Sequence, residues 1–215
     1  MLELKAGVDT IYADGHLLVL SKPPGLLSVP GKGIDKQDCL SSRVQKSYPD
    51  ALIVHRLDMA TSGLMLMARG LAMQSALSKL FENRQIYKCY VAVVEGQMNA
   101  DADWQLIDLP IVLDWLNRPL QIVKTDGKPS QTRWRALHYD TDTNTTRVEL
   151  EPITGRTHQL RVHLKALGHP ILGDALYAPV ALQAKDARLM LHASTLRFVH
   201  PASGEPMVFE NAPAF

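Results

Sequence analysis

The chain has 215 residues, 46% of them hydrophobic, and a formal net charge of only +1 with a pI near 7.8. This composition excludes a disordered chain, and the near-neutral charge excludes a uniformly basic nucleic-acid binder. Any nucleic-acid surface must therefore be a local patch, and the length suits a single domain.

The sequence shows no sign of export, membrane insertion or metal binding. The two cysteines, Cys39 and Cys89, form neither a metal-binding pair nor a disulfide framework, and Cys89 is expected to be a small core side chain. Glu3 and Lys5 interrupt the N-terminal apolar residues, unlike a signal peptide. Because no apolar run approaches ~20 residues, we expect no membrane span and a cytosolic protein. A monomer is also expected.

Hydrophobic periodicity and turn residues predict a series of short elements. In chain order these are strands at 10–13 and 16–20, a helix at about 38–46, a buried strand at 64–68, a helix at 71–83, strands at 86–94, 131–139 and 145–151, a helix at 157–167, and strands at 189–199 and 206–210. Residues 97–130 are predicted to be loop with short strands. The order of the elements indicates one α+β domain with a mixed, largely antiparallel sheet.

Turn and cap signals define several element ends. Asp14-Gly15 predicts a hairpin turn, and the prolines of Lys-Pro-Pro-Gly at residues 22–25 end the second strand. Asp38 is the predicted N-cap of the first helix, and Thr157 that of the last. The last helix has an apolar stripe of Leu160, Leu164 and Leu167. Arg161 falls on a different face, which on pattern alone could simply be solvated.

The stretch that carries the chemistry is residues 55–63, which read His-Arg-Leu-Asp-Met-Ala-Thr-Ser-Gly. It predicts a loop that presents Asp58 and then enters a buried strand, with Gly63 supplying backbone freedom at the turn. A carboxylate so close to a buried strand must be paired or solvated, because burying a lone charge is very costly. From spacing alone, Asp58 could also be a capping or salt-bridged loop residue.

The pattern His-Arg-Leu-Asp-x-x-Thr-Ser-Gly resembles the catalytic signature of the RluA family of pseudouridine synthases. The resemblance extends to Lys-Pro-Pro-Gly at 22–25, Lys-Cys-Tyr at 88–90 and Gly-Arg-Thr-His-Gln-Leu-Arg-Val-His at 155–163. Residues 114–119, 127–129 and 167–174 are similar to the RluA branch itself. The resemblance implies a pseudouridine-synthase catalytic domain over residues 1–215, with a bent sheet, flanking helices, a central cleft and no separate N-terminal RNA-binding domain.

The resemblance also implies roles for three catalytic residues. Asp58 corresponds to the aspartate that converts a uridine N–C glycosidic bond to a C–C bond, as nucleophile or as base. Arg161 corresponds to the arginine that pairs with this aspartate, and a charge-assisted contact would hold the acid ionised. Tyr90 corresponds to a tyrosine placed against the target base, although a strand tyrosine can also be plain core.

Three further residues are expected to bind the substrate: Arg56, Lys88 and Arg156. A uridine within stacked RNA must be extruded before it reacts, and the resemblance assigns Arg56 to filling its place or clamping the flipped nucleotide. Lys88 shares a predicted strand face with Tyr90, and His55 is expected to be a structural loop residue.

Two basic stretches mark the expected RNA surface. Arg118, Lys124, Lys128, Arg133 and Arg135 fall within residues 117–135, with Asp126 the only acid, and Arg156, Arg161 and Lys165 lie within residues 156–165. The partner implied is RNA: a stem-loop, which in the compact RluA branch is the tRNA anticodon loop, a 23S rRNA hairpin or both.

No metal or other cofactor is implied. The histidines of the last third lack any metal-ligand spacing, and no glycine-rich phosphate loop is present. Two other function classes stay open: a glycoside hydrolase, which needs a second acid across the bond, and a catalytically silent RNA-binding module.

Overall fold

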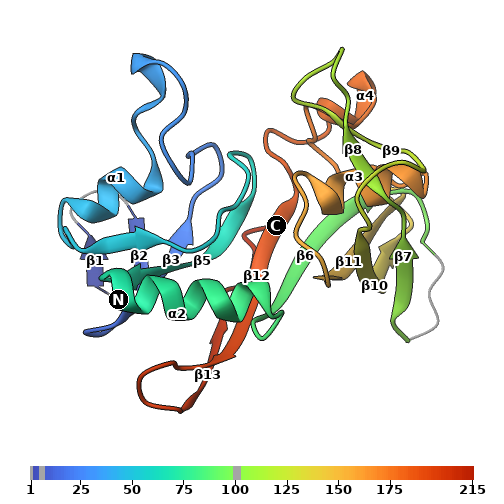
Figure 1. The fold of residues 1–215 in the computed structure, drawn as a ribbon. Helices are drawn as coiled ribbons and strands as arrows, with labels where there is room; N and C mark the ends of the chain where they lie inside the picture. Colours follow the sequence, from blue (N-terminus) through green and yellow to red (C-terminus); the bar gives the residue numbers. More distant parts are fainter. Residues whose placement is uncertain (1, 5–7, 99–102) are drawn as a thin grey trace. The chain divides into compact units, whose positions relative to one another are not determined.

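The computed structural model describes residues 2–4, 8–98 and 103–215 (Figure 1). The chain separates into two compact units. Unit 1 comprises Met1–Lys88 and His192–Ala214, and unit 2 comprises Cys89–Leu191 with Phe215. The expectation of one domain over residues 1–215 stays a prediction.

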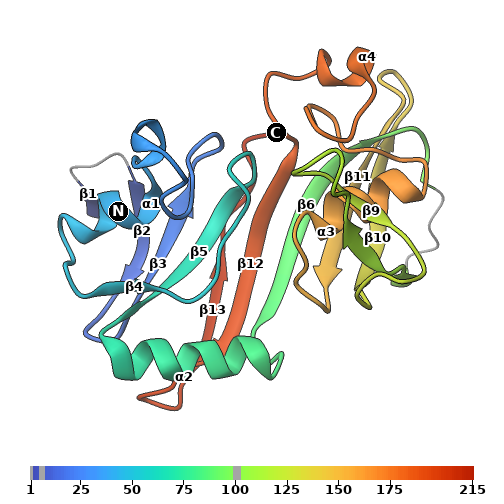
Figure 2. The same ribbon diagram turned by 45° about the horizontal axis from the view of Figure 1, so that its top comes forward.

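Unit 1 contains most of the first ninety residues and the last two strands. Its elements are β1 (Leu2–Leu4), β2 (Val8–Ala13), β3 (Leu17–Lys22), a 3-10 helix (Ile34–Lys36), α1 (Leu40–Gln45), β4 (Ala51–Ile53), β5 (Ser62–Arg69), α2 (Leu71–Glu82), β12 (Leu191–Val199) and β13 (Pro206–Glu210). The strands follow the order β1-β2-β3-β5-β12, with β4 paired to β5 and β13 paired to β12. Figure 2 shows α2 alongside these strands.

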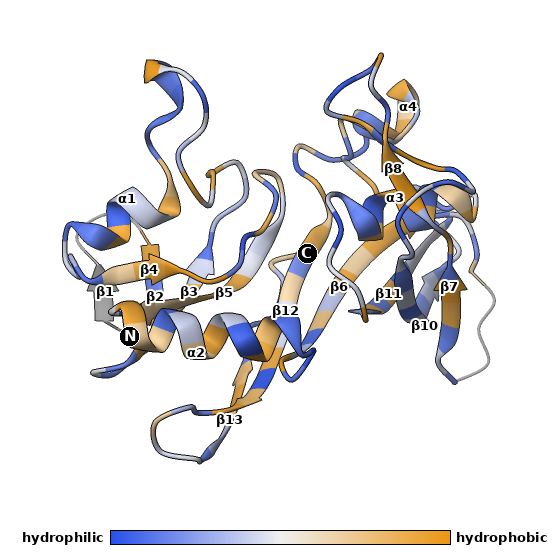
Figure 3. Cartoon of the chain, viewed as in Figure 1, coloured by the Kyte–Doolittle hydropathy of each residue, from blue (hydrophilic) through white to orange (hydrophobic). Residues whose placement is uncertain are grey.

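Strand β5 forms the centre of this unit because both of its faces are buried. Leu64 and Leu66 pack in a cluster with Met73 and Leu77 of α2. Figure 3 shows that hydrophilic and hydrophobic residues alternate along this helix. Met65 and Met67 pack with residues of α1 on the opposite side. Side chains alternate across a strand, so an uninterrupted apolar run fills two layers at once. The predicted buried strand is confirmed.

The pairing of β5 with β12 is parallel, with Gly63 opposite Ala193, and the other strand pairs of unit 1 are antiparallel. Gly63 has a φ of 110°, and a Cβ there would lie 2.3 Å from the carbonyl oxygen of Ala193. Glycine is therefore needed both for its backbone conformation and for the close approach of β12. This arrangement fixes the point where the Asp58 loop enters the sheet.

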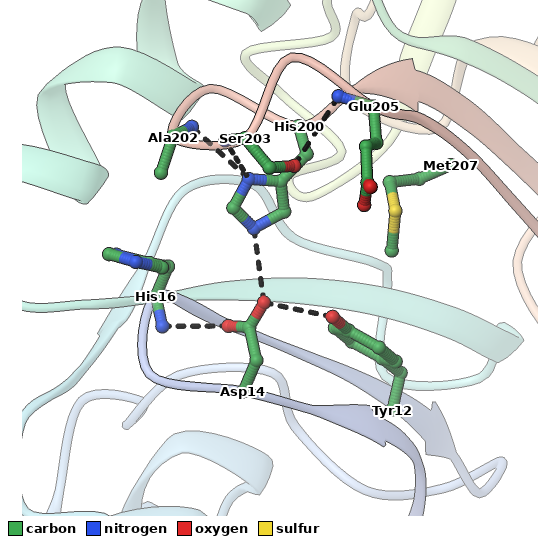
Figure 4. A pocket seen from close by; sticks show the side chains of 8 residues that line it. All are labelled: Tyr12, Asp14, His16, His200, Ala202, Ser203, Glu205 and Met207. Carbon is green, nitrogen blue, oxygen red and sulfur yellow. Dashed lines mark hydrogen bonds and ion pairs between the residues drawn. The ribbon is translucent and has the colours of Figure 1, made fainter.

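The predicted hairpin turn at residues 14 and 15 is confirmed, and it also reaches the C-terminal hairpin (Figure 4). Asp14 accepts hydrogen bonds from the backbone of Leu17, the Tyr12 hydroxyl and Nε2 of His200, the last at 3.1 Å. Burial raises the pKa of Asp14, but these hydrogen bonds outweigh it and the pKa is lowered. A pocket of about 230 Å³ opens beside these residues, and no predicted site residue lines it.

Unit 2 is built on a second group of antiparallel strands. Its elements are β6 (Tyr87–Glu95, which begins in unit 1), β7 (Gln105–Asp108), β8 (Ile111–Leu113), β9 (Gln121–Val123), β10 (Gln131–Asp140), β11 (Thr145–Pro152), α3 (Gln159–Ala166) and α4 (Val180–Gln183). The strand order is β6-β11-β10-β7, and β8 and β9 form a separate hairpin. The predicted α+β class and mixed, largely antiparallel sheet are confirmed.

Two predicted helix caps are wrong. Cys39, not Asp38, caps α1: its Sγ accepts the backbone N–H of Ser42, while Asp38 pairs with Arg43 at 2.6 Å. His158, with a φ of 55°, precedes α3 in place of Thr157. No side chain caps α3, and Oε1 of Gln159 accepts the backbone N–H of Arg156 in the turn that precedes the helix.

Candidate active site

The loop that carries Asp58 connects β4 to β5, and its neighbours hold it through the backbone. Ser28 Oγ donates to the carbonyl of Leu57 at 2.7 Å and accepts the Leu57 N–H at 3.1 Å. The carbonyl of Asp58 accepts the N–H of Thr61 at 3.1 Å, which closes a tight turn. Asp58 itself is half-buried.

Lys22, at the end of β3, fixes the other side of the loop. Its side chain is completely buried, and Nζ donates to the carbonyls of Pro23, Leu26 and Met59 at 2.8–3.0 Å. The backbone N–H of Gly25 also donates to Met59 at 2.9 Å. A buried ammonium is tolerated only when acceptors surround it, so Lys22 ties the Pro-Pro-Gly turn to the residue after Asp58.

His55 has a structural role, as expected. Its Nε2 accepts the backbone N–H of Leu66 at 2.9 Å, and its ring packs on Phe81. Burial, with a smaller contribution from the nearby positive charge of Lys88, lowers the pKa of His55 to about 3. The imidazole is therefore neutral near pH 7 and joins the Asp58 loop to β5 and α2.

Arg56 and Lys88 are the two cations of unit 1 that were expected to bind substrate. Arg56 is exposed and Lys88 half-buried, and among the described residues neither has an acidic partner. Burial lowers the pKa of Lys88, and its effect on the pKa of His55 places it near the Asp58 loop. Both side chains are available to an anionic ligand.

Arg161 occupies a buried position on α3, so the alternative of a solvated helix face does not hold. Its side chain is 4% exposed and forms a bidentate pair with Asp174, whose side chain is fully buried: Nε and Nη2 reach the carboxylate at 2.8 and 2.6 Å. The N–H groups of Leu176 and Tyr177 also donate to Asp174. Planar guanidinium and carboxylate groups match in this geometry, which fixes the orientation of the arginine.

Tyr177 completes the support of Arg161. Its ring lies beneath the guanidinium, 5.0 Å from Cζ to the ring centroid. The Tyr177 hydroxyl is 2.6 Å from Nδ1 of His158 and accepts the backbone N–H of Gln121 at 2.9 Å. The charge of Arg161 is thus held against an aromatic face that the protein itself fixes.

Tyr90 and Arg156 are the other expected site residues of unit 2. Tyr90 is half-buried in β6, opposite Leu150 of β11. Arg156 is exposed, contacts the carbonyl of Pro129 at 3.4 Å, and has no acidic partner within the described part of the chain. Each unit therefore supplies three of the six expected residues: Arg56, Asp58 and Lys88 from unit 1, and Tyr90, Arg156 and Arg161 from unit 2.

Sequence reasoning missed the residues that hold the site. Ser28 gave no signal, and Lys22 and Asp174 stood only inside motifs that carried the family resemblance. A lysine before two prolines and an aspartate in a Leu-Gly-Asp turn are hints, but their roles depend on groups brought close by folding. The predicted contact between Arg161 and Asp58 stays a prediction.

The predicted RNA surface is smaller than the sequence suggested. Arg133 pairs with Glu151 at 2.9 Å, Arg135 with Glu149 at 2.6 Å, and Lys124 with Asp126 at 3.0 Å. The cations of the two basic stretches that have no acidic partner, as far as the structure describes the chain, are Arg118, Lys128, Arg156 and Lys165.

The described residues offer neither a metal site nor a membrane-spanning helix. Within residues 2–4, 8–98 and 103–215, no three His, Cys, Asp or Glu side chains are grouped so that they could hold a metal ion. His163, for example, bonds Thr132 and the carbonyl of Leu109, and burial lowers its pKa. In the same residues, no helix is long and apolar enough to cross a membrane.

Comparisons with known proteins agree on one family. The sequence model of the RNA pseudouridylate synthases matches residues 16–166. The dual-specificity RNA pseudouridine synthase RluA of Escherichia coli K12 is 49% identical over 205 residues, which cover 95% of this chain and 92% of the relative. The protein of the same name from Yersinia pestis is 48% identical over 201 residues, 93% of this chain and 96% of the relative.

Solved structures give the same result. Human RNA pseudouridylate synthase domain containing 1 superposes with a TM-score of 0.81 and 28% identity, covering all of this chain and 87% of the human one. Human RNA pseudouridylate synthase domain containing 4 gives 0.75 and 26%, covering 98% and 90%. These matches support an RNA-modifying isomerase and neither the glycoside hydrolase nor the silent RNA-binding module. The chain belongs to the RNA pseudouridylate synthase family and is an RNA pseudouridine synthase.

Proposed function

We propose that Asp58 is the catalytic carboxylate with which this enzyme isomerises uridine to pseudouridine. The observation that carries the proposal is the way its loop is held. Ser28 and Lys22 bond the backbone of the residues on either side of Asp58. A loop fixed through its backbone presents its central side chain in one place, which is the positioning that catalysis requires.

The reaction is an isomerisation with no redox step. The N1–C1′ glycosidic bond of uridine breaks, the uracil turns within the site, and a C5–C1′ bond forms. The hydrogen on C5 leaves as a proton, and N1 takes up a proton from solvent, so the product is an isomer of the substrate. Asp58 either attacks the ribose or the base as a nucleophile or removes a ribose proton; each role needs the ionised carboxylate. The released C5 hydrogen gives a direct signal of the reaction.

Arg161 is proposed to pair with Asp58 and keep it ionised. Its support is the buried bidentate contact with Asp174 and the face of Tyr177, which hold the guanidinium in one orientation. A cation beside a carboxylate favours its charged form. Tyr90 is proposed to lie against the target uracil, where a ring can stack and a hydroxyl can handle a proton.

Arg56, Lys88 and Arg156 are proposed to contact the RNA. Their support is that each lacks an acidic partner in the described structure, so each can meet a phosphate without first breaking an ion pair. Arg56, which is exposed and lies in the same loop as Asp58, is the residue proposed to take the place of the flipped uridine.

We propose stem-loops of tRNA and of 23S rRNA as substrates, with the tRNA anticodon loop as one site. The relatives' printed name, dual-specificity RNA pseudouridine synthase, supports more than one RNA target. We further propose that the enzyme acts in the cytoplasm as a monomer, needing neither metal nor cofactor.

The test is release of tritium from 5-tritiated uridine in an anticodon stem-loop RNA and in total rRNA. Wild-type enzyme should release tritium, and Asp58→Ala should lower the rate by at least about 10³-fold with an unchanged urea midpoint. Asp35→Ala, which removes an exposed acid of the 3-10 helix in unit 1, is the matched control and should retain full activity. An active Asp58→Ala enzyme would overturn the assignment of the catalytic residue.

A further inference from the structure

The loop between β8 and β9, residues 114–120, is an ordered projection of unit 2. The Asp114 carboxylate accepts the N–H groups of Leu116 and Asn117 at 3.2 and 3.3 Å and the Asn117 side-chain amide at 2.9 Å. The Asp114 backbone N–H donates to the carbonyl of Leu120 at 2.9 Å. The hydrogen bond from Asn117, then those from the backbone, lower the pKa of Asp114, so the bonds persist near pH 7.

The tip of this ordered loop exposes two large apolar side chains. Trp115 is 68% exposed and Leu116 is 94% exposed. The Arg118 guanidinium lies over the Trp115 ring, 4.9 Å from its centroid. Because the loop is already fixed, it loses little further conformational entropy when these side chains contact a ligand.

The base of the hairpin is anchored on the helix that carries Arg161. Ile111 packs with Val162 of α3 and with Tyr177, and Leu120 and Val123 cover the same cluster. The Tyr177 hydroxyl accepts the N–H of Gln121, while its ring supports Arg161. The exposed tip and Arg161 therefore belong to one framework within unit 2.

Amide groups of the loop hydrogen-bond the one carboxylate of residues 114–120, that of Asp114, and two nearby cations lack an acidic partner among the described residues. Arg118 on the tip has no acidic partner among the described residues, and the same holds for Lys128, whose backbone pairs with Ile111 of β8. Arg156 contacts the carbonyl of Pro129, the residue after Lys128. A ligand of this surface should therefore carry negative charge.

We propose that Trp115 is a stacking platform for an unpaired base of the RNA substrate, other than the target uridine, and that Arg118 and Lys128 contact the adjoining phosphates. A single indole with a neighbouring guanidinium matches one nucleobase, since aromatic and arginine planes stack on splayed bases of RNA loops. A folded protein partner would need a far larger apolar area than two side chains. This proposal rests on the proposed function and names a contact for its substrate.

The first test compares the kinetics of tritium release from the anticodon stem-loop RNA. Trp115→Ala should raise KM by about 5- to 100-fold, as expected for loss of one stacked base, with kcat changed less than twofold and an unchanged urea midpoint. Trp115→Phe keeps a smaller ring and should restore most of the lost affinity. The control is Trp104→Phe, whose indole lies beneath Arg133 and Arg135; it should leave KM unchanged.

The second test uses tryptophan fluorescence during titration with the same RNA. Stacking on Trp115 should quench emission in wild type and in Trp104→Phe, and the quench should be lost in Trp115→Phe. A KM within twofold of wild type for Trp115→Ala, or a quench that survives in Trp115→Phe, would overturn the proposal.

The same experiments separate this proposal from the function on which it rests. Tritium release by wild type with an unaffected Trp115→Ala enzyme would overturn only the stacking platform. No release by wild type from either RNA would overturn the proposed substrates and the platform together. A wild-type oligomer that Trp115→Ala converts to monomers in sedimentation would assign the tip to a second copy of the chain and overturn the RNA contact.

Discussion

The two units hold their proposed catalytic residues in opposite ways. In unit 1, Lys22 and Ser28 bond the backbone beside Asp58, so the loop is fixed through main-chain carbonyl and amide groups. In unit 2, Arg161 is fixed through its own side chain, by the buried carboxylate of Asp174 and the ring of Tyr177.

The difference follows from the length and chemistry of the two side chains. Aspartate is short, so placing its backbone places its carboxylate. Arginine is long and flexible, and only contacts at the guanidinium remove its rotamer freedom. Loss of a contact that supports Asp58 should therefore mainly displace its loop. Loss of a contact that supports Arg161 should lower the free energy of unfolding and leave a buried positive charge without its partner.

The largest expected effect is that of Asp174→Ala. It removes the buried bidentate partner of Arg161 and should lower the free energy of unfolding by about 3–5 kcal/mol, measured by urea denaturation. Asp174→Asn keeps the shape and one acceptor and should cost less. Asp38→Ala, which breaks the exposed pair with Arg43, should change stability little. An Asp174→Ala protein as stable as wild type would show that other contacts hold the arginine.

Lys22→Met should have the next largest effect, because it leaves three carbonyls without their charged donor. We expect a loss of about 2–3 kcal/mol in the free energy of unfolding. The tritium-release rate should fall about 10²-fold as the loop loses its position. Ser28→Ala removes a neutral donor and should cost only about 1–2 kcal/mol. Full activity in Lys22→Met would mean that the loop is held without this cation.

The lowered pKa of His55 should make the stability of the protein depend on pH. Its pKa is about 3 when folded and near the ordinary 6.5 when unfolded, so the unfolded chain binds the extra proton between these values. The free energy of unfolding is then greatest above pH 6.5 and decreases as the pH is lowered, by about 2 kcal/mol between pH 7 and pH 5. His55→Gln, which keeps an acceptor for Leu66, should flatten this dependence in urea titrations; an unchanged slope would assign it to other groups.

The smallest expected effect is the loss of a single phosphate contact, tested by comparing two cations of unit 2. Lys128→Gln should weaken RNA binding and lower the slope of log affinity against log salt by about 1, as expected for one lost phosphate contact. Arg135 is already paired with Glu149, so Arg135→Gln should leave that slope unchanged. Equal effects would mean that RNA breaks the pair.

Much of the fold could be predicted because it depends on near neighbours in the chain. The apolar run 64–68, the helical spacing of 71–82 and the Asp-Gly turn each produced the element that the structure contains. The motif at 55–63 likewise placed Asp58 in a loop before a buried strand. The predicted strand pair at 131–139 and 145–151 is also present, as β10 and β11.

Tertiary structure alone decided how the site is held. The complete burial of the Lys22 ammonium depends on a distant acceptor: two of its carbonyl partners lie in its own turn, but the third is that of Met59, 37 residues away in the sequence. The sequence pattern left open a solvated helix face for Arg161, whereas in the folded protein it is buried and paired with Asp174. A sequence shows which side chains carry charge, but whether that charge is exposed or buried and paired depends on desolvation and on partners that only folding brings within hydrogen-bonding distance.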